Sequence, residues 1–257
     1  AFAGVFTPAI VYYFAAGYMP EFRHGWGIPT ATDIAFAIGV ITMLGNMVSP
    51  AMKAFLAALA VIDDLIAIVV IALFYGAGVN FMDLIAAAAV TGLLVYTNKQ
   101  GYLRPLPYCV LGLVLWYLVL KSGVHATIAG VVLAMTIPFK GEVLDKVVYP
   151  MEEWAHALKN WVNFFIIPLF SFLNAGVSFA DFSMENLFHP VIIGVSLGLI
   201  LGKQLGIFSA VYILVQSKAI KMPTNTTWPE IYGTAILCGI GFTMSLFVAT
   251  LAFPPGI

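Results

Sequence analysis

The most constraining feature of the sequence is a series of long apolar runs that contain almost no charged residues. Of 257 residues, 62% are hydrophobic and 9% are charged, which excludes a water-soluble fold. A helix crosses the hydrocarbon core of a bilayer with about 20 apolar residues, and several runs reach that length. Because the runs are continuous and do not alternate in polarity, they predict membrane-spanning helices and not the strands of a barrel.

Prolines, glycines and charge clusters divide these runs into about nine candidate spanning segments. Lysines concentrate in every second connection, which the positive-inside rule assigns to the cytoplasm, so the first segment is expected to run from inside to outside. The formal net charge of −1, with no basic stripe, argues against nucleic-acid binding. The segments are residues 2–18, 28–48, 52–75, 82–96, 103–120, 124–137, 161–177, 190–215 and 232–253.

Glycine and proline interrupt two of these segments, near residues 29–33 and near residues 239–241. Each interruption falls in the second segment of a group, and one group opens the chain while the other closes it. Such pairs are typical of inverted-repeat transporters with two discontinuous helices and a site near the membrane midplane. We therefore predict an all-α polytopic membrane protein.

The predicted organisation is a single transmembrane transporter domain over residues 1–257. The chain starts without Met and stops directly after an apolar run, so we expect it to be truncated at both ends. Residues 1–75 would form the first inverted repeat, residues 82–177 the intervening helices, and residues 190–253 a second repeat that lacks its last helix.

Four charged residues lie in the interior of the apolar runs, away from the segment ends: Asp33, Asp63, Asp64 and Lys203. Each such charge at the centre of a membrane helix costs about 2.5–3.5 kcal/mol. Two adjacent carboxylates in a poorly solvated place cannot both ionise cheaply, and once deprotonated they offer the oxygen ligands that a hard cation such as Na⁺ prefers. Cation and proton would then compete for one site. The pair Asp63 and Asp64 therefore predicts an ion exchanger, and the alternative is a buried polar contact that locks two helices together.

The other polar groups each allow two interpretations. Asp33 either caps backbone N–H groups at a helix break or neutralises the half-dipoles that a broken helix places in the membrane. Lys203 either pairs with an aspartate or extends to an interface. His125 begins a segment, where it either titrates near neutrality or is structural. Glu153 and His156 belong to a mixed-charge cluster that is either a solvated helix end or a cytoplasmic pH sensor.

Six ordered stretches, spread from end to end of the chain, closely resemble the NhaA family of bacterial sodium/proton antiporters. Together they are far more specific than a single pattern. They are residues 27–37 (GIPTATDIAFA), 58–65 (ALAVIDDL), 120–127 (LKSGVHAT), 168–177 (PLFSFLNAGV), 202–206 (GKQLG) and 238–245 (CGIGFTMS).

The resemblance implies that a complete member has about a dozen helices, of which this chain corresponds to the third through the eleventh. It implies that Asp63 and Asp64 bind Na⁺ or Li⁺ and protons. By the same resemblance, Asp33 and Lys203 compensate the ends of two crossing broken helices, and Lys203 pairs with Asp63. Thr32 is implied as an accessory polar group at that crossing.

The resemblance also implies secondary active, electrogenic exchange of Na⁺ or Li⁺ for protons by alternating access. Such a protein is not an enzyme, has no cofactor, and lies in the bacterial inner membrane in contact with lipid and alkali cations; a homodimer is left open. His125 matches a histidine that the family links to pH response, whereas the Glu and His pattern at Glu153 and His156 is only loosely present. A cation channel, an intramembrane aspartyl protease and a structural subunit are the alternatives.

Overall fold

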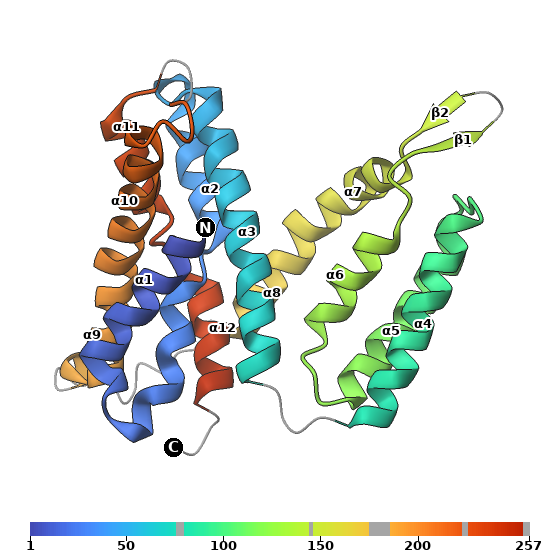
Figure 1. The fold of residues 1–257 in the computed structure, drawn as a ribbon, viewed down its shortest axis with the longest axis horizontal. Coiled ribbons are helices and arrows are strands. Elements are labelled where there is room, and N and C mark those ends of the chain that lie inside the picture. Colours follow the sequence, from blue (N-terminus) through green and yellow to red (C-terminus); the bar gives the residue numbers. More distant parts are fainter. Residues whose placement is uncertain (76–79, 144–145, 175–185, 223–225, 254–257) are drawn as a thin grey trace. The chain divides into compact units, whose positions relative to one another are not determined.

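The structure is a computed structural model that describes residues 1–75, 80–143, 146–174, 186–222 and 226–253 (Figure 1). The described residues are mostly helical. They fall into two compact units, one made of Ala1–Ala67 with Asn174–Ile257 and the other of Ile68–Leu173. Each unit has an apolar core of its own. The prediction of one domain with two repeats is not tested by this division and stays a prediction.

The first unit combines helices from both ends of the chain. Several of its helices begin at or next to a proline, which lacks the N–H that the first turn leaves without a partner. Its elements are α1 (Phe2–Tyr12), η1 (Tyr13–Gly17), η2 (Pro20–Thr30), α2 (Ile34–Met43), η3 (Gly45–Met47), α3 (Pro50–Phe74) as far as Ala67, η5 (Asn186–Phe188), α9 (Pro190–Leu197), η6 (Gly198–Gly202), α10 (Lys203–Gln216), α11 (Trp228–Leu237) and α12 (Phe242–Ala252).

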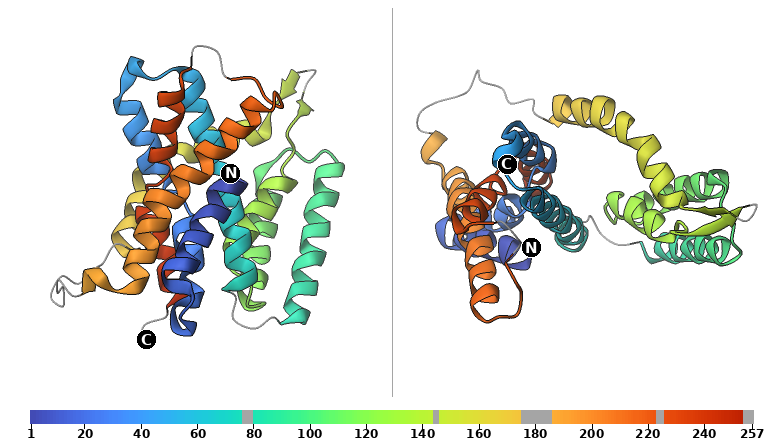
Figure 2. Two further views of the ribbon diagram at one scale, coloured as in Figure 1. Left: turned by 60° about the vertical axis from the view of Figure 1, so that its left-hand side comes forward. Right: turned by 90° about the horizontal axis from the view of Figure 1, so that it is seen from above.

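Helix α1 packs along α10 and the π-helical turn η6 that precedes it (Figure 2). Glycines permit this close approach: a Cβ added at Gly202 would lie 2.6 Å from the Cα of Pro8 on α1. The contact is continuous with the core of the unit, where α2, α3, α10 and α11 bury their apolar side chains. That core consists of Ala37, Ile41, Leu56, Leu59, Ile207, Ala235 and Cys238.

Two helix pairs in this unit are bent at short breaks. The angle is 41° between η2 and α2 and 45° between α11 and α12, and each pair is apolar enough to count as one span. The chain leaves helical geometry at residues 31–33 and 238–241, which overlap the interruptions expected near residues 29–33 and 239–241. The inverted repeat with two discontinuous helices stays a prediction. At the second break, a Cβ on Gly239 would lie 2.7 Å from the carbonyl oxygen of Leu199, so the close backbone approach requires glycine.

The second unit contains the helices between the two ends. Helices α4, α5 and α6 pack on one another around Ala87, Leu94 and Tyr108. Its elements are the end of α3 from Ile68, α4 (Phe81–Lys99), α5 (Pro105–Lys121), α6 (Thr127–Thr136), β1 (Gly141–Val143), β2 (Lys146–Val148), α7 (Pro150–Trp161), η4 (Val162–Ile166) and α8 (Ile167–Asn174) as far as Leu173.

Two parts of this unit differ from the sequence prediction. The strands β1 and β2 form an antiparallel hairpin, with Gly141 opposite Val148, in a stretch that we expected to be only a connection. Strands of three residues are too short for a period of two to be visible in sequence. The segment predicted at residues 161–177 belongs to a helical stretch that already begins at Pro150, and residues 175–177 lie outside the described part.

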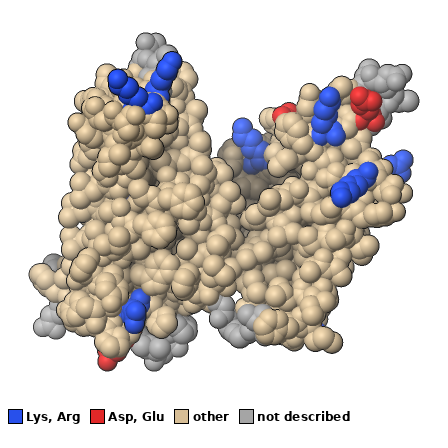
Figure 3. Space-filling model, viewed as in Figure 1, with Lys and Arg blue, Asp and Glu red and all other residues tan. Residues whose placement is uncertain are grey.

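Lengths and composition indicate a multi-pass membrane protein. Among the described residues, three helices are long and apolar enough to cross a membrane, or up to five if each bent pair is one span, and shorter apolar helices accompany them. Many large apolar side chains are exposed, as a lipid-facing surface requires. On the face shown in Figure 3, the charged side chains of the first unit lie at its two ends, and those of the second unit gather towards one end.

Candidate functional site

A buried polar cluster lies where α3, α10 and the first helix break meet. Asp63 stands midway along the 25-residue helix α3 and is fully buried. Its Oδ2 accepts a hydrogen bond from the Nζ of Lys203 at 2.8 Å, so the two form an ion pair with no exposed side-chain surface. The pairing of these two residues, which only the family resemblance implied, is therefore present in the structure.

Lys203 begins α10 directly after the π-helical turn η6. Its ammonium group has three N–H bonds and uses all of them: it donates to Asp63, to the Oγ1 of Thr32, and to the carbonyl oxygen of Thr30 at 2.6 Å. Because all three acceptors are buried, the ammonium group does not extend to an interface. Of the two interpretations of Lys203, the geometry agrees with the pairing with an aspartate, and its functional role stays a prediction.

Thr32 links this ion pair to the second helix break. Its hydroxyl accepts from Lys203 and lies 3.2 Å from Asp63 Oδ2 and 3.0 Å from the carbonyl oxygen of Cys238. A hydroxyl has a single proton, so it can donate fully to only one of these two acceptors. In the structure Thr32 lies in the first break and contacts Lys203, Asp63 and the second break; its role as an accessory polar group, which the family resemblance implied, stays a prediction.

Asp33 joins the beginnings of two helices. It is the N-cap of α2, where its Oδ1 accepts from the backbone N–H of Phe36 at 3.1 Å. Its Oδ2 accepts from the backbone N–H of Thr243 at 3.1 Å and from the Thr243 hydroxyl, at the start of α12. One carboxylate thus faces the positive ends of two helix dipoles. The structure shows the capping hydrogen bonds, and dipole compensation by Asp33 stays a prediction.

The consecutive aspartates present two acceptors without partners. Within the described part of the chain, Asp63 Oδ1 and Asp64 Oδ1 are buried and have no hydrogen-bond partner. Buried polar atoms are almost always hydrogen-bonded, and an exception calls for an explanation such as an ion or a proton. Carboxylate oxygens that have no hydrogen-bond partner can take up a proton or serve as ligands of a hard cation.

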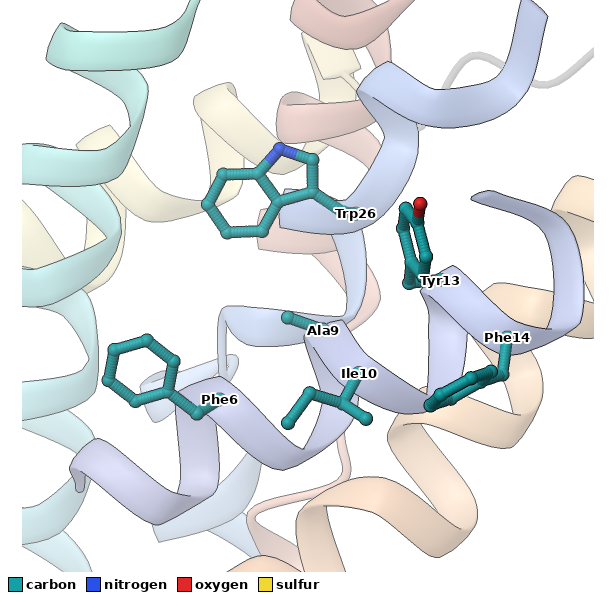
Figure 4. A pocket seen from close by; sticks show the side chains of 6 residues that line it. All are labelled: Phe6, Ala9, Ile10, Tyr13, Phe14 and Trp26. Atoms are coloured by element: carbon teal, nitrogen blue, oxygen red, sulfur yellow. The ribbon is translucent and has the colours of Figure 1, made fainter. Parts of the chain in front are cut away.

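An open apolar groove of about 590 Å³ on the same unit has a different character (Figure 4). Side chains from α1, η1 and η2 line it: Phe6, Ala9, Ile10, Tyr13, Phe14 and Trp26. None of the polar cluster residues lines this groove, so it belongs to the apolar surface and not to the cluster.

The residues linked to pH response lie in the second unit, outside the cluster. His125 occupies the turn before α6, and its Nδ1 lies 2.9 Å from the hydroxyl of Thr127. Partial burial lowers the pKa of the His125 imidazole below its ordinary value. Glu153 and His156 are exposed on α7. The structure therefore brings together Thr32, Asp33, Asp63 and Lys203, with Asp64 next along α3.

Sequence reasoning missed Thr243 and the backbone groups of the cluster. Thr243 lies two residues after Gly241 in the second interrupted run, and this position at a helix start was a usable signal. The carbonyl oxygens of Thr30 and Cys238 had no signal, because any residue supplies a carbonyl.

Comparison with known proteins decides the family. Residues 1–256 match the family model described as Na+/H+ antiporter 1. The chain belongs to this antiporter family. It is 48% identical over 255 residues to the Na(+)/H(+) antiporter NhaA of Caulobacter vibrioides, an alignment that covers 98% of the chain and 62% of the relative. It is 48% identical over 256 residues to the NhaA of Pseudomonas putida strain GB-1, covering 100% of the chain and 65% of the relative.

A third antiporter relative, the NhaA of Nitrobacter hamburgensis, is 47% identical over 254 residues, covering 99% of the chain and 62% of that protein. The chain thus spans somewhat less than two thirds of the length of these antiporters. The resemblance seen in the six sequence stretches is confirmed, and the family is one of transporters and not of enzymes.

Proposed function

We propose that this chain supplies the ion-binding core of a secondary antiporter that exchanges Na⁺ or Li⁺ for protons. The observation that carries the proposal is the pair of buried, unpartnered oxygens on the consecutive residues Asp63 and Asp64, of which Asp63 also forms an ion pair with Lys203. Membership of the antiporter family and relatives named Na(+)/H(+) antiporter support it.

The mechanism follows from competition for the carboxylates. When protons leave Asp63 and Asp64, their oxygens can take over part of the hydration shell of a cation; when protons return, the cation leaves. At acidic pH the protonated pair cannot bind the cation, so exchange should fail there and increase at alkaline pH. If both aspartates release a proton for each cation bound, net charge crosses the membrane and transport is electrogenic.

Alternating access would involve the two helix breaks. The bent pairs η2–α2 and α11–α12 meet at the cluster through Asp33 and Thr32. Inverted repeats around such crossing broken helices would expose the aspartates first to one side of the membrane and then to the other. The protein would lie in the bacterial inner membrane, serve sodium and pH homeostasis, and act as a monomer or a homodimer.

The test is collapse of a pH gradient by Na⁺ in proteoliposomes that contain the full-length gene product, from pH 6 to 9. Wild type should collapse the gradient saturably and more strongly at alkaline pH, while Asp63→Asn and Asp64→Asn should not. Asp83→Asn is the matched control, since Asp83 bonds to Asn80 at the start of α4 and belongs to the second unit. Full exchange by Asp64→Asn would refute the site, and non-saturating flux would indicate a channel.

A further inference from the structure

The two oxygens of Asp63 have unlike surroundings. Oδ2 accepts from Lys203 and lies within hydrogen-bond distance of Thr32. Oδ1 is buried and, among the residues that the structure describes, has no hydrogen-bond partner. A cation that binds Asp63 while the ion pair persists must therefore approach from the Oδ1 side.

Helix α1 presents bare backbone to that oxygen. Gly4 is buried on α1, and a Cβ added there would lie 3.8 Å from Asp63 Oδ1, in van der Waals contact. The same Cβ would lie 2.9 Å from the Cγ1 of Ile207 on α10. Glycine therefore leaves open the place beside Oδ1 that the Cβ of any other residue would fill.

Resting on the proposed antiport function, we propose that Gly4 sets the width of the cation site beside Asp63 and so allows Na⁺ as well as the smaller Li⁺. Selectivity between hard cations depends on the size of the cavity and on the number of ligands that fit around the ion. A methyl group in contact with Oδ1 narrows this space from the α1 side. Na⁺ needs more room than Li⁺, so it should lose more affinity.

The experiment compares Gly4→Ala with Gly39→Ala in the full-length protein. Gly39 also lies in a helix of the first unit, but a Cβ there would meet nothing within 4 Å. Gly4→Ala should raise KM for Na⁺ about tenfold, as a single methyl group in a binding pocket does, and KM for Li⁺ by at most about threefold. Gly39→Ala should match wild type for both ions. Stabilisation against heat by added Na⁺ gives a second, transport-independent measure of binding.

A second pair of variants separates the cation site from helix packing. Ile207→Ala removes the side chain that the new methyl group would press against, so Gly4→Ala with Ile207→Ala should fold even where Gly4→Ala alone does not. The double variant should keep the higher KM for Na⁺ relative to Ile207→Ala. If it returns to the KM of Ile207→Ala, the effect is packing and the proposal is wrong.

The remaining outcomes are also decisive. Equal values for Gly4→Ala and Gly39→Ala, or equal losses for Na⁺ and Li⁺, would overturn the role of Gly4 and leave the antiport function intact. Absence of exchange in wild type would instead overturn the antiport function itself.

Discussion

Replacing Lys203 by methionine should destabilise the protein much more than neutralising both members of its ion pair. Methionine keeps most of the volume of lysine but removes three donated hydrogen bonds, to Thr30, Thr32 and Asp63. It also leaves the Asp63 carboxylate without its buried counter-charge. Removing one partner of a buried ion pair costs about 3–5 kcal/mol. With Asp63→Asn added, the uncompensated charge disappears, and about 1–3 kcal/mol remains for the lost hydrogen bonds.

The measurement is a double-mutant cycle on the full-length protein in detergent, with free energies of unfolding from titration with SDS followed by tryptophan fluorescence. The coupling is the cost of the double variant minus the costs of both single variants. Lys203→Met alone should cost about 2 kcal/mol more than the double variant, and Asp63→Asn has a cost of its own, so the coupling should be at least about 2 kcal/mol in magnitude. Lys53→Met is the control, since Lys53 donates to the carbonyl oxygen of Gly45 and the change should cost only about 1 kcal/mol. A coupling below about 0.5 kcal/mol would mean that the two sites act independently, and the ion-pair reasoning would be refuted.

Two further predictions concern single residues. Asp33→Ala leaves the N–H groups of Phe36 and Thr243 without their acceptor and should lower the free energy of unfolding by about 2–4 kcal/mol in the same titration; a loss below about 0.5 kcal/mol would contradict the shared cap. Burial lowers the pKa of His125 in the folded protein. As the pH falls, the imidazole of the unfolded protein is therefore protonated at a higher pH than that of the folded protein. The stability that this residue contributes is complete above its ordinary pKa of 6.5 and is lost as the pH falls through the lower folded value. His125→Gln should therefore lose less thermal stability than wild type between pH 7 and pH 5, and equal losses would contradict the assignment.

The sequence predicts the helical class well because helices that are buried in a membrane require long apolar runs, which are visible in the local sequence. Apolar runs of membrane length give helices, and glycine and proline mark the places where the chain bends, as at residues 31–33. The hairpin at Gly141–Val143 and Lys146–Val148 leaves no such trace, because strands of three residues carry no detectable period. The helix from Pro150 into residue 161 is polar, so hydropathy alone does not detect it.

The candidate site is predictable only in part, for a different physical reason. Asp63 and Lys203 are conspicuous because a charge in an apolar run is costly, but composition does not say that a residue 140 positions away is the partner. That pairing depends on how α3 and α10 pack, and only the family resemblance supplied it. Thr243 escaped notice because a threonine in a membrane helix is unremarkable until its hydroxyl and N–H are seen at Asp33.

Several hydrogen bonds join the first helix break directly to the second. The N–H of Asp33 donates to the carbonyl oxygen of Ile240 at 2.6 Å, the hydroxyl of Ser245 donates to the carbonyl oxygen of Ile28 at 3.1 Å, and Asp33 in turn accepts from Thr243. Pulling one break away from the other would sever all of these bonds together, each worth about 0.5–1.5 kcal/mol. A tilt of α2 that preserved these bonds would therefore have to carry the start of α12 with it.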